Sequence, residues 1–189
     1  MKKILLHICC GPCATHVMSS LKKDYMATGY FCNPNIQPVE EYARRLEAVK
    51  TVALRLDIPV IEEVYDPDLF FDAIHGLEGE PENGSRCLVC YRLRLMRTCR
   101  FASSNGYDSV ASTLTVGPMK KASLINPIGC EEAARAGVTF LEADWKKSDG
   151  FRHSCEMSKE YGIYRQHYCG CVYSIKTQPQ LNKGSTDSE

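Results

Sequence analysis

Apolar positions occur in short continuous runs along the chain, and longer segments with helical spacing of apolar residues separate these runs. Continuous apolar runs are typical of strands buried on both faces of a parallel sheet, and amphipathic segments are typical of the helices that cover it. The pattern predicts strands over residues 3–8, 28–33, 58–65, 107–114 and 138–145. It predicts helices over residues 15–24, 39–57, 67–77, 87–106 and 120–137, the last with an internal proline.

This alternation of strands and helices predicts an α/β fold: a single domain with a mostly parallel sheet and helices on both faces, Rossmann-like or HUP-like. We expect the domain to span residues 1–176 and the polar segment 177–189 to be a flexible tail. The first apolar run stops at His7, so no export signal is expected, and no run is long enough to cross a membrane. Functional residues of such folds lie at the carboxyl ends of the strands.

Composition adds two constraints. Lys and Arg total 23 and Asp and Glu total 23, so any polyanionic partner must be bound by a local basic patch. The 189 residues include 11 cysteines, an odd number, and clustered thiols in a chain without an export signal indicate metal or redox chemistry in a reducing cytoplasm. The cysteines that stand alone are expected to pack as small apolar residues: Cys32, Cys99, Cys130 and Cys155.

The first cysteine group, Cys9, Cys10 and Cys13, follows the first predicted strand in the motif HICCGPC. A nucleotide-binding α/β protein presents phosphate-binding amides at this turn, whereas this chain presents thiols. The amino terminus of a helix near Cys13 would favour the thiolate form of these side chains. The motif therefore predicts ligation of a metal ion or a cluster.

The second group is a CxxC motif, Cys87 and Cys90, at the start of a predicted helix. This motif alone is compatible with zinc, an iron–sulfur cluster or a redox disulfide. Together with the first group it would provide four thiolates. Adjacent ligands such as Cys9 and Cys10 do not suit the spaced pairs of structural zinc, whereas a cluster with separate iron corners accepts them, so the pattern favours iron–sulfur over zinc.

The third group is a CxC motif, Cys169 and Cys171, around Gly170. Such a pair closes only into a small, strained and therefore reducible disulfide, and the glycine supplies the backbone freedom that this ring needs. The motif predicts a redox pair, with metal ligation as the alternative.

Six motifs in this order resemble the metal-dependent, cobalamin-independent epoxyqueuosine reductases of the QueH type. The motifs are LLHICCGPC (5–13), NPNIQPVEEYARR (33–45), RCLVCYRLRL (86–95), STLTVGPMKK (112–121), ADWKKSDGF (143–151) and YRQHYCGC (164–171). They cover most of the chain, and their combination is far more specific than any one of them. The departures are small: Gly11 stands where alanine is frequent, and serine is more frequent near Gly117.

The resemblance implies the last step of queuosine formation, in which the epoxide of epoxyqueuosine at the anticodon wobble position of tRNA is reduced to a cyclopentene. This reaction is a two-electron deoxygenation that needs an external electron donor. The implied ligands of a four-iron, four-sulfur cluster are Cys9, Cys10, Cys87 and Cys90, and the implied redox pair is Cys169 and Cys171. Cys13 is either a structural thiol or a ligand of an additional iron ion.

Polar residues in and near these motifs are candidates for substrate binding: Asn33, Asn35, Tyr42, Arg92, Lys120, Tyr164, Arg165 and Gln166. Arg44 and Arg45 follow Tyr42 on the same predicted helix. Further basic residues could join Arg92 and Lys120 in a phosphate-binding surface: Arg86, Arg94, Lys121, Lys146 and Lys147. The alternative interpretations are an Asn-Pro turn for the asparagines and a solvated helix face for the charges. A tyrosine or histidine of residues 164–168 is a candidate proton donor, whereas His7 and His16 are expected to form structural hydrogen bonds.

Two other classes of protein remain open at this point. One is a zinc-stabilised module that binds tRNA, in which the cysteines serve only the fold. The other is a PP-loop-like tRNA-modifying enzyme that activates its substrate with ATP. Such an enzyme needs an SGGxDS loop after its first strand, and CCGPC occupies that place here, which argues against nucleotide activation.

Overall fold

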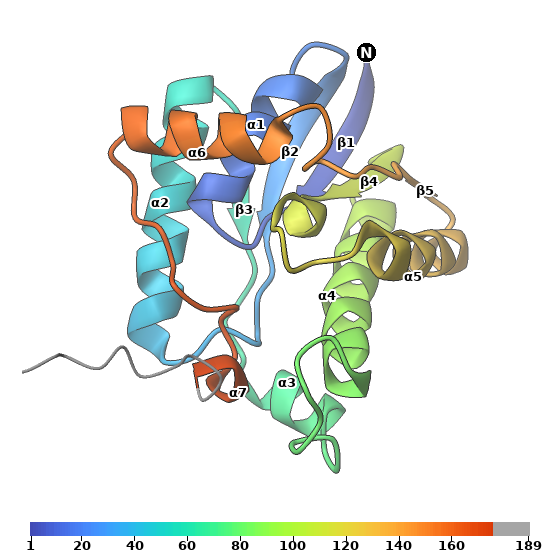
Figure 1. The fold of residues 1–189 in the computed structure, drawn as a ribbon. Coiled ribbons are helices and arrows are strands. Elements are labelled where there is room, and N and C mark those ends of the chain that lie inside the picture. Colours follow the sequence, from blue (N-terminus) through green and yellow to red (C-terminus); the bar gives the residue numbers. More distant parts are fainter. Residues whose placement is uncertain (176–189) are drawn as a thin grey trace, which may run out of the picture.

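A five-stranded parallel sheet forms the centre of the computed structural model, which describes residues 1–175. The strands are β1 (Lys2–His7), β2 (Tyr25–Phe31), β3 (Val60–Glu62), β4 (Ser109–Ser112) and β5 (Thr139–Phe140). Their order is β3-β2-β1-β4-β5, and all neighbouring pairs are parallel (Figure 1). The predicted fold class, a single α/β domain of Rossmann-like or HUP-like type, is confirmed.

Helices cover both faces of this sheet (Figure 1). They are α1 (Gly11–Leu21), α2 (Val39–Leu56), α3 (Asp68–Ala73), α4 (Ser85–Ser104), α5 (Ala122–Ala136), α6 (Gly150–Glu160) and α7 (Val172–Ile175), with a 3-10 turn, η1 (Thr113–Val116), after β4. Helix α1 packs against α2 and α6 on one face, whereas α4 packs against α5 on the other. No helix of the described part of the chain is both long and apolar enough to cross a membrane.

The predicted elements are present, but several boundaries differ. The helix expected from residue 15 begins at Gly11, because Pro12 occupies its first turn and needs no amide donor there. The two edge strands, β3 and β5, are three and two residues long, shorter than the apolar runs that predicted them. Helices α6 and α7 were not predicted. The domain end at residue 176 and the tail expected over residues 177–189 lie outside the described residues.

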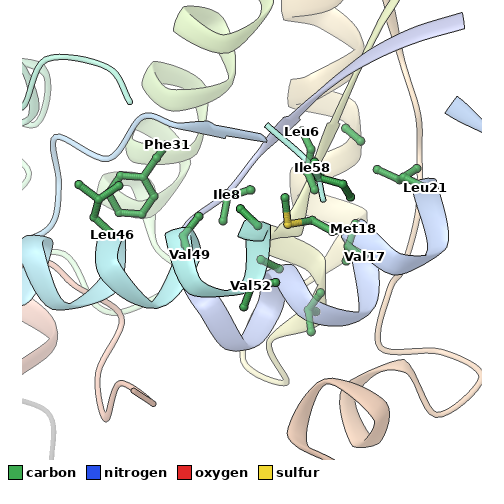
Figure 2. Packing of buried hydrophobic residues seen from close by; sticks show 14 of the residues in the cluster. Leu6, Ile8, Val17, Met18, Leu21, Phe31, Leu46, Val49, Val52 and Ile58 are labelled. Atoms are coloured by element: carbon green, nitrogen blue, oxygen red, sulfur yellow. The ribbon is translucent and has the colours of Figure 1, made fainter. Parts of the chain in front are cut away.

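Alternation along β1 divides the core between the two faces of the sheet. Ile4 and Leu6 point into the larger cluster under α1 and α2, whereas Leu5 points into the cluster under α4 and α5. Figure 2 shows Leu6 and Phe31 of the sheet packed with side chains of α1 and α2 in the larger cluster. Each fully buried aliphatic side chain of this kind contributes about 1.5–3 kcal/mol to stability.

The start of α1 lies unusually close to α2. A Cβ atom added at Gly11 would be 2.8 Å from the Cβ of Ala48 and 2.9 Å from its carbonyl carbon and oxygen. The absence of a side chain at Gly11 therefore lets the turn between β1 and α1 rest on α2. This contact fixes the position of the adjacent cysteines at the carboxyl end of the central strand.

Candidate functional site

The first thiol group lies in the turn from β1 into α1. The sulfur atoms of Cys9, Cys10 and Cys13 all lie within 4.8 Å of one another, and the Sγ atoms of Cys9 and Cys10 are 3.7 Å apart. A tetrahedral ion with metal–sulfur bonds of about 2.3 Å places its sulfur ligands roughly 3.8 Å apart. The group therefore has the spacing of ligands to a metal, as the HICCGPC motif predicts.

Deprotonation of one of these three thiols makes deprotonation of the other two less favourable. Hydrogen bonds from Cys10 and Cys13 hold the pKa of Cys9 well below its ordinary value. For Cys10, the hydrogen bond with Cys13 lowers the pKa, but the hydrogen bond with Cys9 and burial together raise it to about 12. Hydrogen bonds with Cys10 and Cys9, followed by burial, raise the pKa of Cys13. A metal ion that replaces the two remaining protons would offset this effect.

The second thiol group combines the CxxC and CxC motifs, about 80 residues apart in the sequence. Cys87 and Cys90 lie in the first two turns of α4, and Cys90 packs with Cys171 in one apolar cluster. Burial raises the pKa of Cys90 to about 11. All eleven cysteines are free thiols in the structure, so the disulfide expected between Cys169 and Cys171 is not formed here, and the redox role of the pair remains a prediction.

Arg94 lies between the two thiol groups. Its side chain is fully buried on α4, one turn after Cys90, and its Nη2 donates a hydrogen bond of 2.6 Å to Oδ1 of Asn33. The amide of Asn33 in turn donates to the carbonyl of Ile8 at the end of β1, at 2.8 Å. The positive charge of Arg94 lowers the pKa of both Cys9 and Cys90. One buried guanidinium thus acts on both groups.

A second buried arginine holds the CxC segment in place. Arg45 of α2 donates from its Nη2 to the carbonyl of Tyr168 at 2.9 Å and from its Nη1 to the carbonyl of Cys169 at 3.0 Å. Its Nε donates to Glu41 at 2.7 Å. Gly170 has a φ of +128°, and a Cβ atom there would lie 3.1 Å from Nη1 of Arg45. The glycine therefore permits both the backbone turn and the close approach of the guanidinium.

A cavity of about 440 Å³ joins the two thiol groups, since Cys13 of the first and Cys169 of the second both line it. Lys120 lies in the wall with its Nζ 3.0 Å from Sγ of Cys169. Gln166 donates from its Nε2 to Sγ of Cys10 at 2.9 Å, and its buried Oε1 has no hydrogen-bond partner within residues 1–175. The cavity has the size of a small-molecule site.

The structure separates the predicted substrate contacts into two sets. Three line the cavity: Lys120, Arg165 and Gln166. Five do not line it: Asn33, Asn35, Tyr42, Arg92 and Tyr164. Tyr42 packs in the core against Phe31, and Arg92 forms ion pairs with two glutamates of α5. A role of these five in substrate binding remains a prediction.

Sequence reasoning assigned Arg94 to a phosphate-binding surface and gave Arg45 no role, so it missed the internal hydrogen bonds of both. Helical spacing could have found both, because Arg94 follows the buried Cys90 by four residues and precedes the buried Leu95 by one. Arg45 likewise follows the buried Glu41 by four residues on α2. His7, in contrast, is fully buried and hydrogen-bonded as expected: burial lowers its pKa to about 3.

A family model described as epoxyqueuosine reductase QueH matches residues 4–177. The chain belongs to the QueH family. Among its relatives, the epoxyqueuosine reductase QueH of Streptococcus pyogenes serotype M1 is 40% identical, over 93% of this chain and 71% of the relative. That of Thermotoga maritima is 34% identical, over 93% of this chain and 91% of the relative. Membership makes this QueH chain an oxidoreductase of queuosine biosynthesis.

A solved structure supports the fold without adding to the function. The predicted subunit of a tRNA methyltransferase from Methanocaldococcus jannaschii aligns with a TM-score of 0.58, over 88% of this chain and 94% of that chain. At 13% sequence identity the likeness concerns the arrangement of strands and helices alone. The QueH motifs, not this likeness, carry the functional assignment.

Proposed function

We propose that this QueH-family protein reduces epoxyqueuosine to queuosine at the wobble position of the tRNA anticodon, the last step of queuosine biosynthesis. The observation that carries the proposal is the meeting of two thiol groups at one cavity, with Cys13 and Cys169 in its wall. Family membership supplies the substrate class. The free thiols suit a reducing cytoplasm, where we place the protein.

Four cysteine thiolates are the usual donor set of a four-iron, four-sulfur cluster. We assign as its ligands Cys9 and Cys10, at the end of β1, together with Cys87 and Cys90 on α4. Bound there, the cluster would supply low-potential electrons next to the cavity. Cys13 lies within 4.8 Å of the first two sulfurs and lines the cavity, which supports a role as ligand of an additional iron ion over a purely structural one.

The CxC pair can supply the electrons and protons that the reaction consumes. Conversion of an epoxide into an alkene and water consumes two electrons and two protons. Closure of Cys169 and Cys171 to a disulfide releases two electrons and two protons, and an external donor must then restore the thiols. The pair can therefore provide reducing equivalents for one turnover.

A proton donor is needed where the epoxide oxygen departs. The hydroxyl groups of Tyr164 and Tyr168 donate to Glu41 at 2.7 Å and to the carbonyl of Gln37 at 2.5 Å, respectively. His167 lines the cavity, and imidazole is the side chain that most often transfers protons in catalysis, so we assign proton delivery to it.

Anaerobic purification with iron and sulfide analysis and electron spin resonance tests the cluster, and nucleoside mass spectrometry of epoxyqueuosine-containing tRNA tests the reaction. We expect about four iron and four sulfide ions per chain, or one more iron if Cys13 binds it, together with conversion to queuosine. A colourless zinc protein that binds tRNA without converting it would instead support the zinc-stabilised binding module. Iron without epoxide reduction would contradict the proposed reaction.

A further inference from the structure

The two thiols of the CxC motif have different surroundings. Cys169 is partly exposed and lines the cavity. Cys171 is only 7% exposed and packs with Phe70 and Ile74 in an apolar cluster. Ligands and reagents that enter the cavity therefore meet Cys169 first.

Lys120 is the cation next to this exposed thiol. Its Nζ lies 3.0 Å from Sγ of Cys169 and 3.4 Å from the hydroxyl of Tyr91, and it sits 5.1 Å from the centre of the Tyr91 ring. An ammonium group at this distance stabilises a thiolate relative to a thiol. The tyrosine ring provides a further favourable contact for the cation and none for a neutral amine.

The position of Lys120 is fixed by its neighbours. Its carbonyl accepts a hydrogen bond of 2.6 Å from Nζ of Lys146, which also pairs with Asp144 at 3.2 Å. Burial lowers the pKa of Lys120, but the interactions of its ammonium group with Cys169 and Tyr91 outweigh burial and raise it. The side chain therefore remains charged inside the protein, directed at sulfur and not at solvent.

We propose that Lys120 is the counter-ion of a Cys169 thiolate and makes Cys169, not Cys171, the reactive thiol of the pair. Lys120 is then a positioning residue and not a phosphate contact. During oxidation the Cys169 thiolate and the Cys171 thiol form the disulfide and release two electrons and one proton. The epoxide oxygen takes up this proton and a second one, supplied from solvent through His167, and leaves as water. The inference rests on the redox role proposed above for the pair.

Thiol labelling tests this assignment without substrate or turnover. The anaerobic iron-loaded protein is treated with iodoacetamide over a range of pH, and labelling of Cys169 and Cys171 is followed by peptide mass spectrometry. We expect Cys169 to react first in the wild-type protein. In Lys120→Gln its rate at pH 7 should fall about tenfold and recover at alkaline pH, because the thiolate no longer has a cation 3.0 Å from its sulfur.

Two further variants separate charge from structure. Lys120→Arg should restore most of the labelling rate, because it retains the charge. Lys121→Gln removes the same charge from the exposed neighbouring residue and should leave the rate unchanged. Iron content equal to that of the wild type establishes that each variant is folded.

Labelling of Cys169 at the wild-type rate in Lys120→Gln would overturn the inference, as would faster labelling of Cys171. Weaker tRNA binding by Lys120→Gln with unchanged labelling would return Lys120 to the phosphate-binding surface. Failure of the protein to reduce epoxyqueuosine would contradict the proposed function, whereas the labelling result would still decide the pairing of Lys120 with Cys169.

Discussion

The two thiol groups of this protein differ in how they are built. Cys9, Cys10 and Cys13 lie within five consecutive positions of one turn, and their thiols form hydrogen bonds with one another. The second group brings a helix start together with a distant carboxyl-terminal segment, and cations lie among its thiols: Lys120 beside Cys169 and Arg94 beside Cys90.

This difference has a chemical consequence. Thiols that share one charge at short range need a metal to lose their remaining protons, so the first group is suited to ligation alone. In the second group, burial raises the pKa of Cys90 despite the charge of Arg94, whereas Cys169 has the ammonium group of Lys120 at 3.0 Å, which stabilises a thiolate without a metal. The two motifs of the second group can therefore have different roles, the CxxC thiols as ligands and the CxC thiols as a redox pair.

The largest effect is expected from removing a ligand. Cys9→Ala, Cys10→Ala, Cys87→Ala and Cys90→Ala should each abolish the cluster and epoxide reduction, because each opens one iron corner. Iron and sulfide analysis and nucleoside mass spectrometry measure the two losses. Cys99→Ala is the matched control, since Cys99 is buried as Cys10 is, but in a separate apolar cluster; it should retain iron at a cost of about 1–2 kcal/mol in stability. Full iron occupancy in Cys87→Ala would refute its assignment.

The next effect separates the two motifs of the second group. Cys169→Ser and Cys171→Ser should keep the cluster spectrum and lose turnover, because serine cannot form the disulfide. Iron content, absorbance and product are recorded on the same anaerobic samples. Loss of iron from either variant would show that the residue is a ligand, and the two motifs would then not have separate roles. Unchanged turnover would show that the pair is structural.

A smaller effect is expected from Arg94, the residue that acts on both groups. Arg94→Met removes a buried positive charge beside the cluster ligands, so an added electron becomes less favourable and the reduction potential should fall. The lost hydrogen bond to Asn33 should lower the free energy of unfolding by about 2–3 kcal/mol. Redox titration followed by spin resonance measures the potential, with Arg94→Lys as the charge-retaining control. An unchanged reduction potential in Arg94→Met would mean that this arginine stabilises the fold and does not affect the cluster.

The fold was predictable because the residue patterns that specify its strands and helices are local in the sequence. The apolar run of β1 and the helical period of α2 specify those elements directly, and parallel packing then places Cys9 and Cys10 at a sheet edge. Helix α6 was missed because most of its residues are polar, although its few apolar residues share one face. The length of edge strands such as β5 was overestimated, because the apolar sequence continues beyond the last residue that pairs with the neighbouring strand.

The candidate site was predictable as a set of motifs and not as an arrangement. Sequence spacing identified Cys169 and Lys120 as candidates, but it placed Lys120 on a phosphate-binding surface. Its contact with sulfur depends on the path of the chain between β4 and α5 and on the fold of the carboxyl-terminal segment, which no local pattern encodes. For the same reason the clamp of Arg45 on the CxC backbone became visible only in the structure.

The smallest effect concerns tRNA, and it tests whether cations beside the second thiol group serve the substrate backbone. Arg92 and Lys146 are already paired with carboxylates, whereas Lys121 and Lys147 are exposed at a neighbouring hollow. Lys121→Gln and Lys147→Gln should each weaken tRNA binding several-fold at low salt and reduce the slope of log affinity against log salt by about 1.

Fluorescence anisotropy of labelled tRNA over a series of salt concentrations measures both quantities, and Arg92→Gln is the control, because its guanidinium is held by Glu131 at 2.8 Å and Glu132 at 2.6 Å. A chain with equal numbers of acidic and basic residues must bind a polyanion through few contacts, so the loss of a single lysine should be measurable. Affinity that does not change with salt would mean that these lysines are only solvated, and that recognition depends on the cavity beside Cys169 alone.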